Sequence, residues 1–191
     1  TKKGNFLKQI IYTDCHELAT NLIKTDVLTV AAASNVRLIG DIIDGANCKK
    51  SDVNKAIDLI NILKLRHGDN YIFGNHERQG MPAPCYIKLE NAVLAHGDLE
   101  ANFQKWLEYR NKAMGASFFK RGVIVNAIEA AEKIINRKPK EDFLNKAANI
   151  AKYHGVKTYV CGHFHPDEKI EVEHKGYRII ILPRGRNEIE L

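Results

Sequence analysis

The sequence predicts an α/β fold, in which strands of a sheet alternate along the chain with helices. Short apolar segments alternate with segments of helical periodicity, and polar residues follow directly where several apolar segments end. With 191 residues, the chain is long enough for one domain with a full core. In such folds, ligands bind beyond the carboxyl ends of the strands.

Five apolar runs bounded by turn residues are predicted to be strands, over residues 8–14, 36–43, 70–75, 91–98 and 157–163. Residues 168–185 are predicted to form a hairpin. Its first half, "KIEVEH", alternates as a half-exposed strand should, and "HKG" can form the turn.

Helices are predicted between these strands. Residues 17–33 form one, and residues 51–68 form another that Ser51 can cap and Gly68 can end. Residues 99–155 differ from the rest because they are predicted to be helical, are basic and contain the single tryptophan. We interpret residues 1–191 as one domain with a helical cap inserted over 99–155. One face of a helix in this segment carries Leu144, Ala147, Ala148 and Ala151, and Gly155 can terminate that helix.

The composition, 45% hydrophobic and 27% charged, is ordinary for a soluble protein. No apolar run could span a membrane, and no signal-peptide pattern occurs near the N-terminus, so we expect a cytoplasmic protein. The four cysteines form no C-x-x-C pair and are expected to be reduced thiols. Residues 105–140 contain nine basic and three acidic residues, an excess equal to the net charge of +6 of the whole chain. Such a region attracts phosphate groups, nucleic acid or an anionic membrane surface, or is a solvated helical face.

The stretch "YVCGHFHPDEK" places His163 and His165 two residues apart at the end of a predicted strand. Residues i and i+2 of a strand point to the same side, which suits two imidazoles on one metal or on two neighbouring metals. Four other predicted strands also end in oxygen or imidazole donors. These donors are Asp14 and His16, then Asp41, then Asn75, His76 and Glu77, and then His96.

In this order, the motifs D-x-H, G-D, G-N-H-E, H-G-D and G-H-F-H resemble those of the calcineurin-like metallophosphoesterases, from Asp14 to His165. The resemblance implies a four-layer αββα sandwich of the metallo-dependent phosphatase type and a centre of two divalent metal ions. It implies that Asp14, His16 and His165 bind one ion, that Asn75, His96 and His163 bind the other, and that Asp41 bridges them. Mixed nitrogen and oxygen ligands suit Mn²⁺ first, and also Fe or Zn²⁺.

The same resemblance implies hydrolysis of phosphoester or pyrophosphate bonds, with a hydroxide shared by the two ions attacking phosphorus in line. His76 would lie near the substrate and aid the leaving group. Glu77 would orient His76 through its other ring nitrogen, and Asp44 would have a supporting role at best.

The inserted segment resembles the cap of the UDP-2,3-diacylglucosamine hydrolases, which cleave a pyrophosphate in a lipid-linked nucleotide. Trp106, Arg110, Lys120 and Arg121 would then contact acyl chains, phosphates or a membrane surface. Those enzymes typically have arginine where this chain has His76. A nuclease or cyclic-nucleotide phosphodiesterase is an alternative, in which the basic segment holds a nucleic-acid backbone. A non-catalytic metal-binding scaffold is another alternative.

Overall fold

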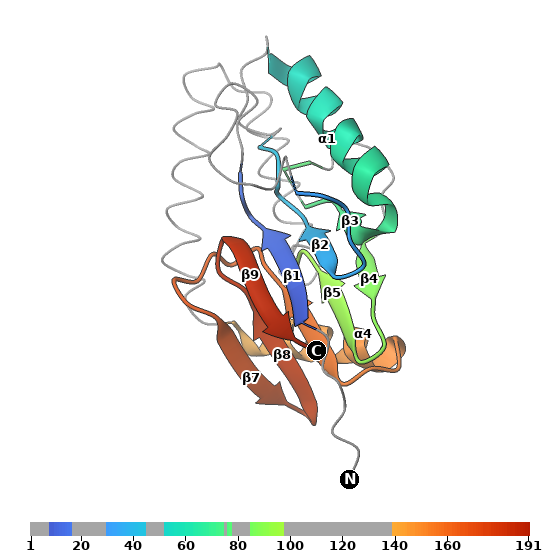
Figure 1. Ribbon diagram of the computed structural model, residues 1–191. Coiled ribbons are helices and arrows are strands. Elements are labelled where there is room, and N and C mark those ends of the chain that lie inside the picture. The colour runs from blue at the N-terminus through green and yellow to red at the C-terminus, as the bar shows by residue number, and fades with distance from the viewer. Residues whose placement is uncertain (1–7, 17–29, 45–51, 75, 78–84, 98–138) are drawn as a thin grey trace, which may run out of the picture.

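The computed structural model describes residues 8–16, 30–44, 52–74, 76–77, 85–97 and 139–191. Within them the protein has a mixed α/β fold with two sheets, which confirms the predicted class (Figure 1). Most of the helix predicted over 17–33 and most of the segment 99–155 lie outside the described residues.

The first sheet has four strands in the order β3-β2-β1-β9. Three of them are parallel, and β9 pairs antiparallel with β1. The bounds are Lys8–Thr13 for β1, Val36–Ile39 for β2, Tyr71–Ile72 for β3 and Gly185–Glu190 for β9. The strand predicted over residues 70–75 is thus shorter than expected, and β9 was not predicted.

The second sheet has five strands in the order β4-β5-β6-β8-β7, with β4 and β7 antiparallel at its edges. The bounds are Tyr86–Lys88 for β4, Ala92–Ala95 for β5, Thr158–Cys161 for β6, Ile170–His174 for β7 and Tyr177–Ile181 for β8. The predicted hairpin is β7–β8. Lys175 and Gly176 in its turn both have positive φ, as a two-residue type I′ turn requires.

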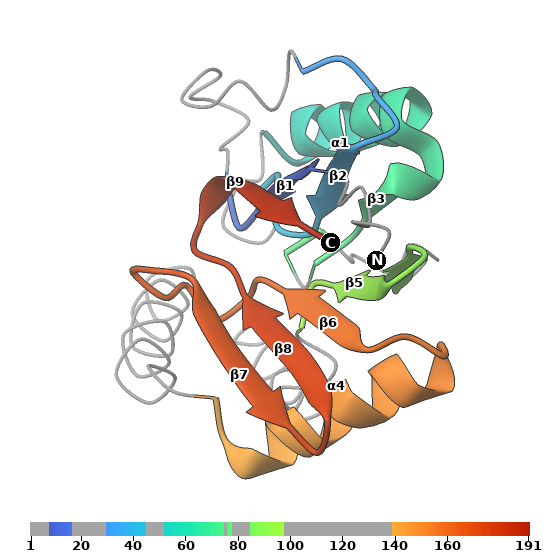
Figure 2. The same cartoon turned by 60° about the horizontal axis from the view of Figure 1, so that its bottom comes forward.

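The two sheets pack face to face because the buried strands alternate apolar residues between their two faces. Ile11, Ile39 and Ile72 of the first sheet meet Leu94 and Val160 of the second in a core between the sheets. Residues on the opposite faces pack against one helix each. Figure 2 shows the resulting layers from top to bottom as α1, the first sheet, the second sheet and α4.

Helix α1 (Val53–His67) covers the first sheet, and α4 (Glu141–Tyr153) covers the second. Gly68 follows α1 with a φ of 55°, as predicted, whereas Ser51 lies outside the described residues. All four residues of the predicted apolar face of α4, Leu144, Ala147, Ala148 and Ala151, are buried. Among the described residues, no helix has the length and apolar character needed to cross a membrane.

Candidate metal centre

The predicted ligands that the structure describes gather where the parallel strands of both sheets end. Backbone hydrogen bonds tie these loops together, from the amide of Asp14 to the carbonyl of Gly40 (3.0 Å) and from the amide of Gly162 to the carbonyl of His96 (3.1 Å). Six non-glycine residues within the described ranges have positive φ, and five of them are predicted ligands, at 48–67°: Asp14, His16, Asp41, His163 and His165. Such strained backbone is concentrated at functional sites.

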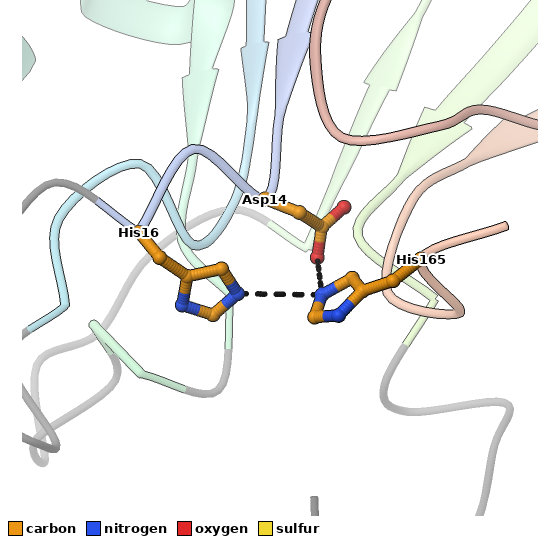
Figure 3. Close-up of side chains that lie close together, drawn as sticks. All are labelled: Asp14, His16 and His165. Carbon is orange, nitrogen blue, oxygen red and sulfur yellow. Dashed lines mark hydrogen bonds and ion pairs between the residues drawn. The ribbon is translucent and has the colours of Figure 1, made fainter. Parts of the chain in front are cut away.

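The first cluster consists of Asp14, His16 and His165, whose ligand atoms all lie within 4.8 Å of one another. Nε2 of His165 lies 2.9 Å from Oδ1 of Asp14 and 3.3 Å from Nε2 of His16. Figure 3 shows that the carboxylate and the two rings converge, although His165 comes from a loop far in the sequence from the one that carries Asp14 and His16. Two imidazole nitrogens that face each other this closely can share either a proton or a metal ion.

Asp14 is 1% exposed and is fixed by groups around its carboxylate. Oδ2 accepts hydrogen bonds from the Thr13 hydroxyl (2.5 Å) and from the backbone amide of His163 (2.9 Å). Burial alone would raise the pKa of Asp14, but the hydrogen bond from His165 and the charge of His96 hold it below its ordinary value. The carboxylate is therefore ionised at neutral pH and can bind a cation.

The second cluster consists of Asp41, His96 and His163. Oδ2 of Asp41 lies 3.2 Å from Nε2 of His96, which in turn lies 3.3 Å from Nδ1 of His163. Nδ1 of His96 lies 3.1 Å from the carbonyl oxygen of Ile39, so this nitrogen carries the proton and donates it. When the ring is neutral, that bond leaves the lone pair of Nε2 directed into the cluster, which is the usual arrangement of a metal-binding histidine.

Asp41 belongs to the second cluster and also faces the first. Besides its contact with His96, its Oδ2 lies 4.0 Å from Nε2 of His16 and 3.9 Å from Nε2 of His76. Oδ1 accepts a hydrogen bond of 2.8 Å from the backbone amide of His76. A Cβ atom on Gly74 would lie only 2.1 Å from Oδ1, so only glycine leaves room for this carboxylate. One carboxylate therefore faces ligand atoms of both clusters.

Two histidines of the clusters are electrically neutral at neutral pH. Burial lowers the pKa of His16 to about 4, although the charge of Asp41 opposes this shift. Burial, followed by the charge of His96, lowers the pKa of His163 to about 3. Neutral imidazoles keep a free lone pair, which is the form that binds metals.

His76 interacts with Asp44, and this corrects the prediction that Glu77 orients it. Nδ1 of His76 lies 2.8 Å from Oδ1 of Asp44. Burial alone would lower the pKa of His76, but the charge of Asp41 and the hydrogen bond to Asp44 outweigh it and raise the pKa to about 9. His76 is therefore protonated at neutral pH, and Asp44 contacts its ring directly.

Glu77 is fully buried and binds the backbone rather than His76. Its carboxylate accepts hydrogen bonds of 2.9–3.1 Å from the amides of Asp41, Ile42, Ile43 and Gly74 and one of 2.6 Å from the hydroxyl of Tyr71. Burial and then the charge of Asp41 raise the pKa of Glu77 to about 7, while the Tyr71 hydrogen bond limits the rise. Glu77 thus joins the loop after β2 to the loop after β3, which fixes the backbone on both sides of Asp41.

Several predicted site residues lie outside the described residues and are not placed. They are Asn75, Trp106, Arg110, Lys120 and Arg121. Conversely, Arg184 contacts the site but was not predicted, because nothing in its sequence context separates it from an ordinary surface arginine. Its Nε donates a hydrogen bond of 3.2 Å to the backbone carbonyl of Asp14.

Neither a protein-family model nor a curated protein matches the sequence. Among solved structures, a conserved uncharacterized protein of Streptococcus pneumoniae, described as a predicted phosphoesterase, is similar at 14% identity and a TM-score of 0.42. That match covers 96% of this chain and 84% of the other. A phosphopantetheinyl hydrolase of Mycobacterium tuberculosis is similar at 11% identity and a TM-score of 0.37, with coverage of 95% and 91%. At these values the likeness carries no argument about the activity.

Proposed function

We propose that the protein is a metal-dependent hydrolase of phosphate esters or phosphate anhydrides. One observation supports this most. Two clusters of carboxylate and imidazole ligands adjoin at Asp41, whose carboxylate belongs to the second cluster and lies 4.0 Å from His16 of the first, and a protonated histidine with its own carboxylate partner lies beside them. Paired metal ions with a nearby proton donor are suited to in-line displacement at phosphorus.

The residues present fit two divalent ions. Asp14, His16 and His165 would hold one, His96 and His163 would hold the other, and Asp41 would contact both. We propose Asn75 as a further ligand of the second ion, in keeping with the family resemblance. The donors are oxygens and imidazole nitrogens without a thiolate, which suits Mn²⁺ first, and Fe or Zn²⁺ as alternatives.

When bound, two such ions lower the pKa of water and offset the negative charge of the phosphoryl oxygens. The chain itself would supply a proton. Asp44 accepts from Nδ1 of His76, so Nε2 of the protonated ring carries a second proton and faces Asp41. This proton can stabilise the developing charge on the leaving oxygen or be transferred to it.

The proposed substrate is a phosphate-containing small molecule or a lipid-linked nucleotide of the UDP-2,3-diacylglucosamine type. The lipid-linked substrate is proposed because residues 99–155 resemble the cap of the UDP-2,3-diacylglucosamine hydrolases. It also depends on the proposed contacts of Trp106, Arg110, Lys120 and Arg121. Peripheral contact with a membrane belongs to the same proposal.

The test is hydrolysis of bis-p-nitrophenyl phosphate and of UDP-2,3-diacylglucosamine with Mn²⁺, together with the metal content by elemental analysis. Asp41→Ala should lose metal and turnover together, because it removes the carboxylate that faces both clusters. His76→Ala should retain the metal and lose about 10²–10⁴-fold in rate, the usual contribution of a general acid. Chelation of the wild type should abolish turnover reversibly.

His174→Ala is the matched control, because His174 is a half-buried histidine that bonds Asn145 outside the clusters. It should behave as the wild type. Turnover that survives in Asp41→Ala, or full activity in His76→Ala, would refute the proposed centre. Selective release of UMP from the lipid would identify residues 99–155 as a cap for acyl chains.

A further inference from the structure

Arg184 lies at the edge of the candidate metal centre, in the short loop between β8 and β9. The chain on its amino side runs beside the end of β6, where the Leu182 amide donates to the carbonyl of Cys161 at 2.7 Å. On its carboxyl side, Gly185 pairs with Thr13, the residue before Asp14. The Nε of Arg184 then donates to the carbonyl of Asp14 at 3.2 Å. The guanidinium is thus hydrogen-bonded to the backbone of Asp14, a predicted metal ligand.

The loop that carries Arg184 is held in one shape. The side-chain amide of Asn187 donates to the carbonyl of Pro183 (2.9 Å) and to the carbonyl of Gly185 (3.1 Å), one on each side of Arg184. Pro183 fixes its own φ, and Gly185 has a φ of 88°, which favours glycine. An arginine on such a loop loses less freedom when it binds a ligand than one on a flexible loop does.

The charge of Arg184 is not offset by a carboxylate among the described residues, and this separates it from neighbouring arginines. Arg178 contacts Glu171, with 2.6 Å between Nε and Oε1, and Arg186 contacts Glu188, with 2.5 Å between Nη2 and Oε1. Within the ranges that the structure describes, the hydrogen bond to Asp14 occupies only the Nε of Arg184. Among the described residues, Nη1 and Nη2 have no hydrogen-bond acceptor and can bind a ligand, and a guanidinium binds phosphate oxygens well with two parallel hydrogen bonds.

We propose that Arg184 binds a second anionic group of the substrate, a phosphate next to the one held at the metal clusters. The inference rests on the proposed function and narrows it to substrates that contain a diphosphate. A diester with one phosphate carries no such group and gains nothing from this arginine. The specificity of the site would therefore come from the β8–β9 loop as well as from the metal ligands.

The experiment compares the binding of methylenediphosphonate and methylphosphonate to the Mn²⁺-loaded chain of 191 residues by isothermal titration calorimetry. The wild type should bind the diphosphonate more tightly. Arg184→Gln should weaken diphosphonate binding about tenfold to a hundredfold, the size of one charge-assisted hydrogen-bonded pair, and change methylphosphonate binding less than about twofold. Arg184→Lys should show an intermediate loss because it keeps the charge without the two-pronged geometry.

Arg186→Gln is the control, because Arg186 is a nearby exposed arginine already paired with Glu188. It should leave both affinities unchanged. Equal weakening of the two ligands in Arg184→Gln, together with metal loss, would show that Arg184 only supports the Asp14 backbone and would overturn the proposal. Unchanged diphosphonate affinity would overturn it as well.

A result that refutes the proposed hydrolase activity can be distinguished from one that refutes the role of Arg184. A wild type that discriminates the two phosphonates through Arg184 but hydrolyses no phosphate ester or anhydride would refute the hydrolase and leave this assignment standing. A wild type that hydrolyses esters but binds both phosphonates equally would refute the assignment alone.

Discussion

Adding a single methyl group at Gly162, in Gly162→Ala, should weaken metal binding strongly while the protein still folds. A Cβ atom at this position would lie 1.9 Å from Oγ1 of Thr13 and 2.2 Å from Oδ2 of Asp14, whereas ordinary contact begins at 3.4 Å. In Gly162→Ala the Asp14 oxygen must therefore move by about 1.2 Å, the difference between the last two distances. Metal ligands tolerate displacements of only about 0.2 Å, so the Asp14 cluster should lose its geometry.

The expected magnitudes differ for stability and for metal binding. Overpacking costs about 1–3 kcal/mol, and the reduced freedom of the unfolded chain returns about 0.4–1 kcal/mol. The net loss of about 1–2 kcal/mol corresponds to a Tm lower by about 2–8 °C for a chain of this length. Changes beside a metal ligand typically reduce affinity about 10–100-fold, and we expect at least that loss for Mn²⁺.

Gly155→Ala is the matched control for this prediction. Gly155 has a φ of 72°, and among the described residues no atom outside Gly155 and its chain neighbours lies within 4 Å of the position that an alanine methyl group would occupy, so alanine there is strained without touching the site. That strain costs about 1–2 kcal/mol, similar to the loss expected for Gly162→Ala. Thermal melts of the chelated proteins and calorimetric Mn²⁺ titrations measure the two quantities. Wild-type Mn²⁺ affinity in Gly162→Ala, or an equal loss in Gly155→Ala, would refute the reasoning.

Two further predictions concern the loops after β2 and β3. Glu77→Gln should lower the free energy of unfolding by about 3 kcal/mol, because two buried amides lose an acceptor at about 1–3 kcal/mol each, and urea denaturation without effect would contradict this. Asp44→Asn should lower the pKa of His76 in the metal-free protein from about 9 towards its ordinary 6.5, as NMR titration would show, whereas the exposed Asp142→Asn should not. Because the folded pKa of His76 lies above its unfolded value, its contribution to stability is complete below about pH 6.5 and is lost as pH rises through about 9. In the Asp44→Asn protein, the contribution of His76 to stability should be lost at a lower pH than in the wild type.

Much of the architecture follows from local patterns in the sequence. Strands β1, β2, β5 and β6 could be predicted from the composition of their apolar runs and from the turn residues that bound them. β9 was missed because Gly185–Glu190 is mostly polar, with only Ile189 buried, and becomes a strand by pairing with β1. Short β4 likewise depends on pairing with β5.

The site divides in a similar way. Six of the seven predicted ligands fall within the described residues and lie in the clusters, because strand ends of parallel sheets meet at one edge. The partner of His76 could not be predicted from spacing. Glu77 is adjacent in sequence but turns to the backbone amides of another loop, while Asp44 reaches the ring across 32 residues. Which carboxylate contacts the ring of His76 depends on how the loops after β2 and β3 pack against each other.

The positive φ angles of the ligand residues have a consequence for the evolution and engineering of this chain. Each left-handed residue other than glycine costs about 1–2 kcal/mol, so Asp14, His16, Asp41, His163 and His165 together lower the stability of a fold whose total margin is about 5–15 kcal/mol. Glycine at one of these positions would relieve strain while removing a ligand. Selection for thermal tolerance alone should therefore favour inactive proteins, and activity and robustness must be selected together.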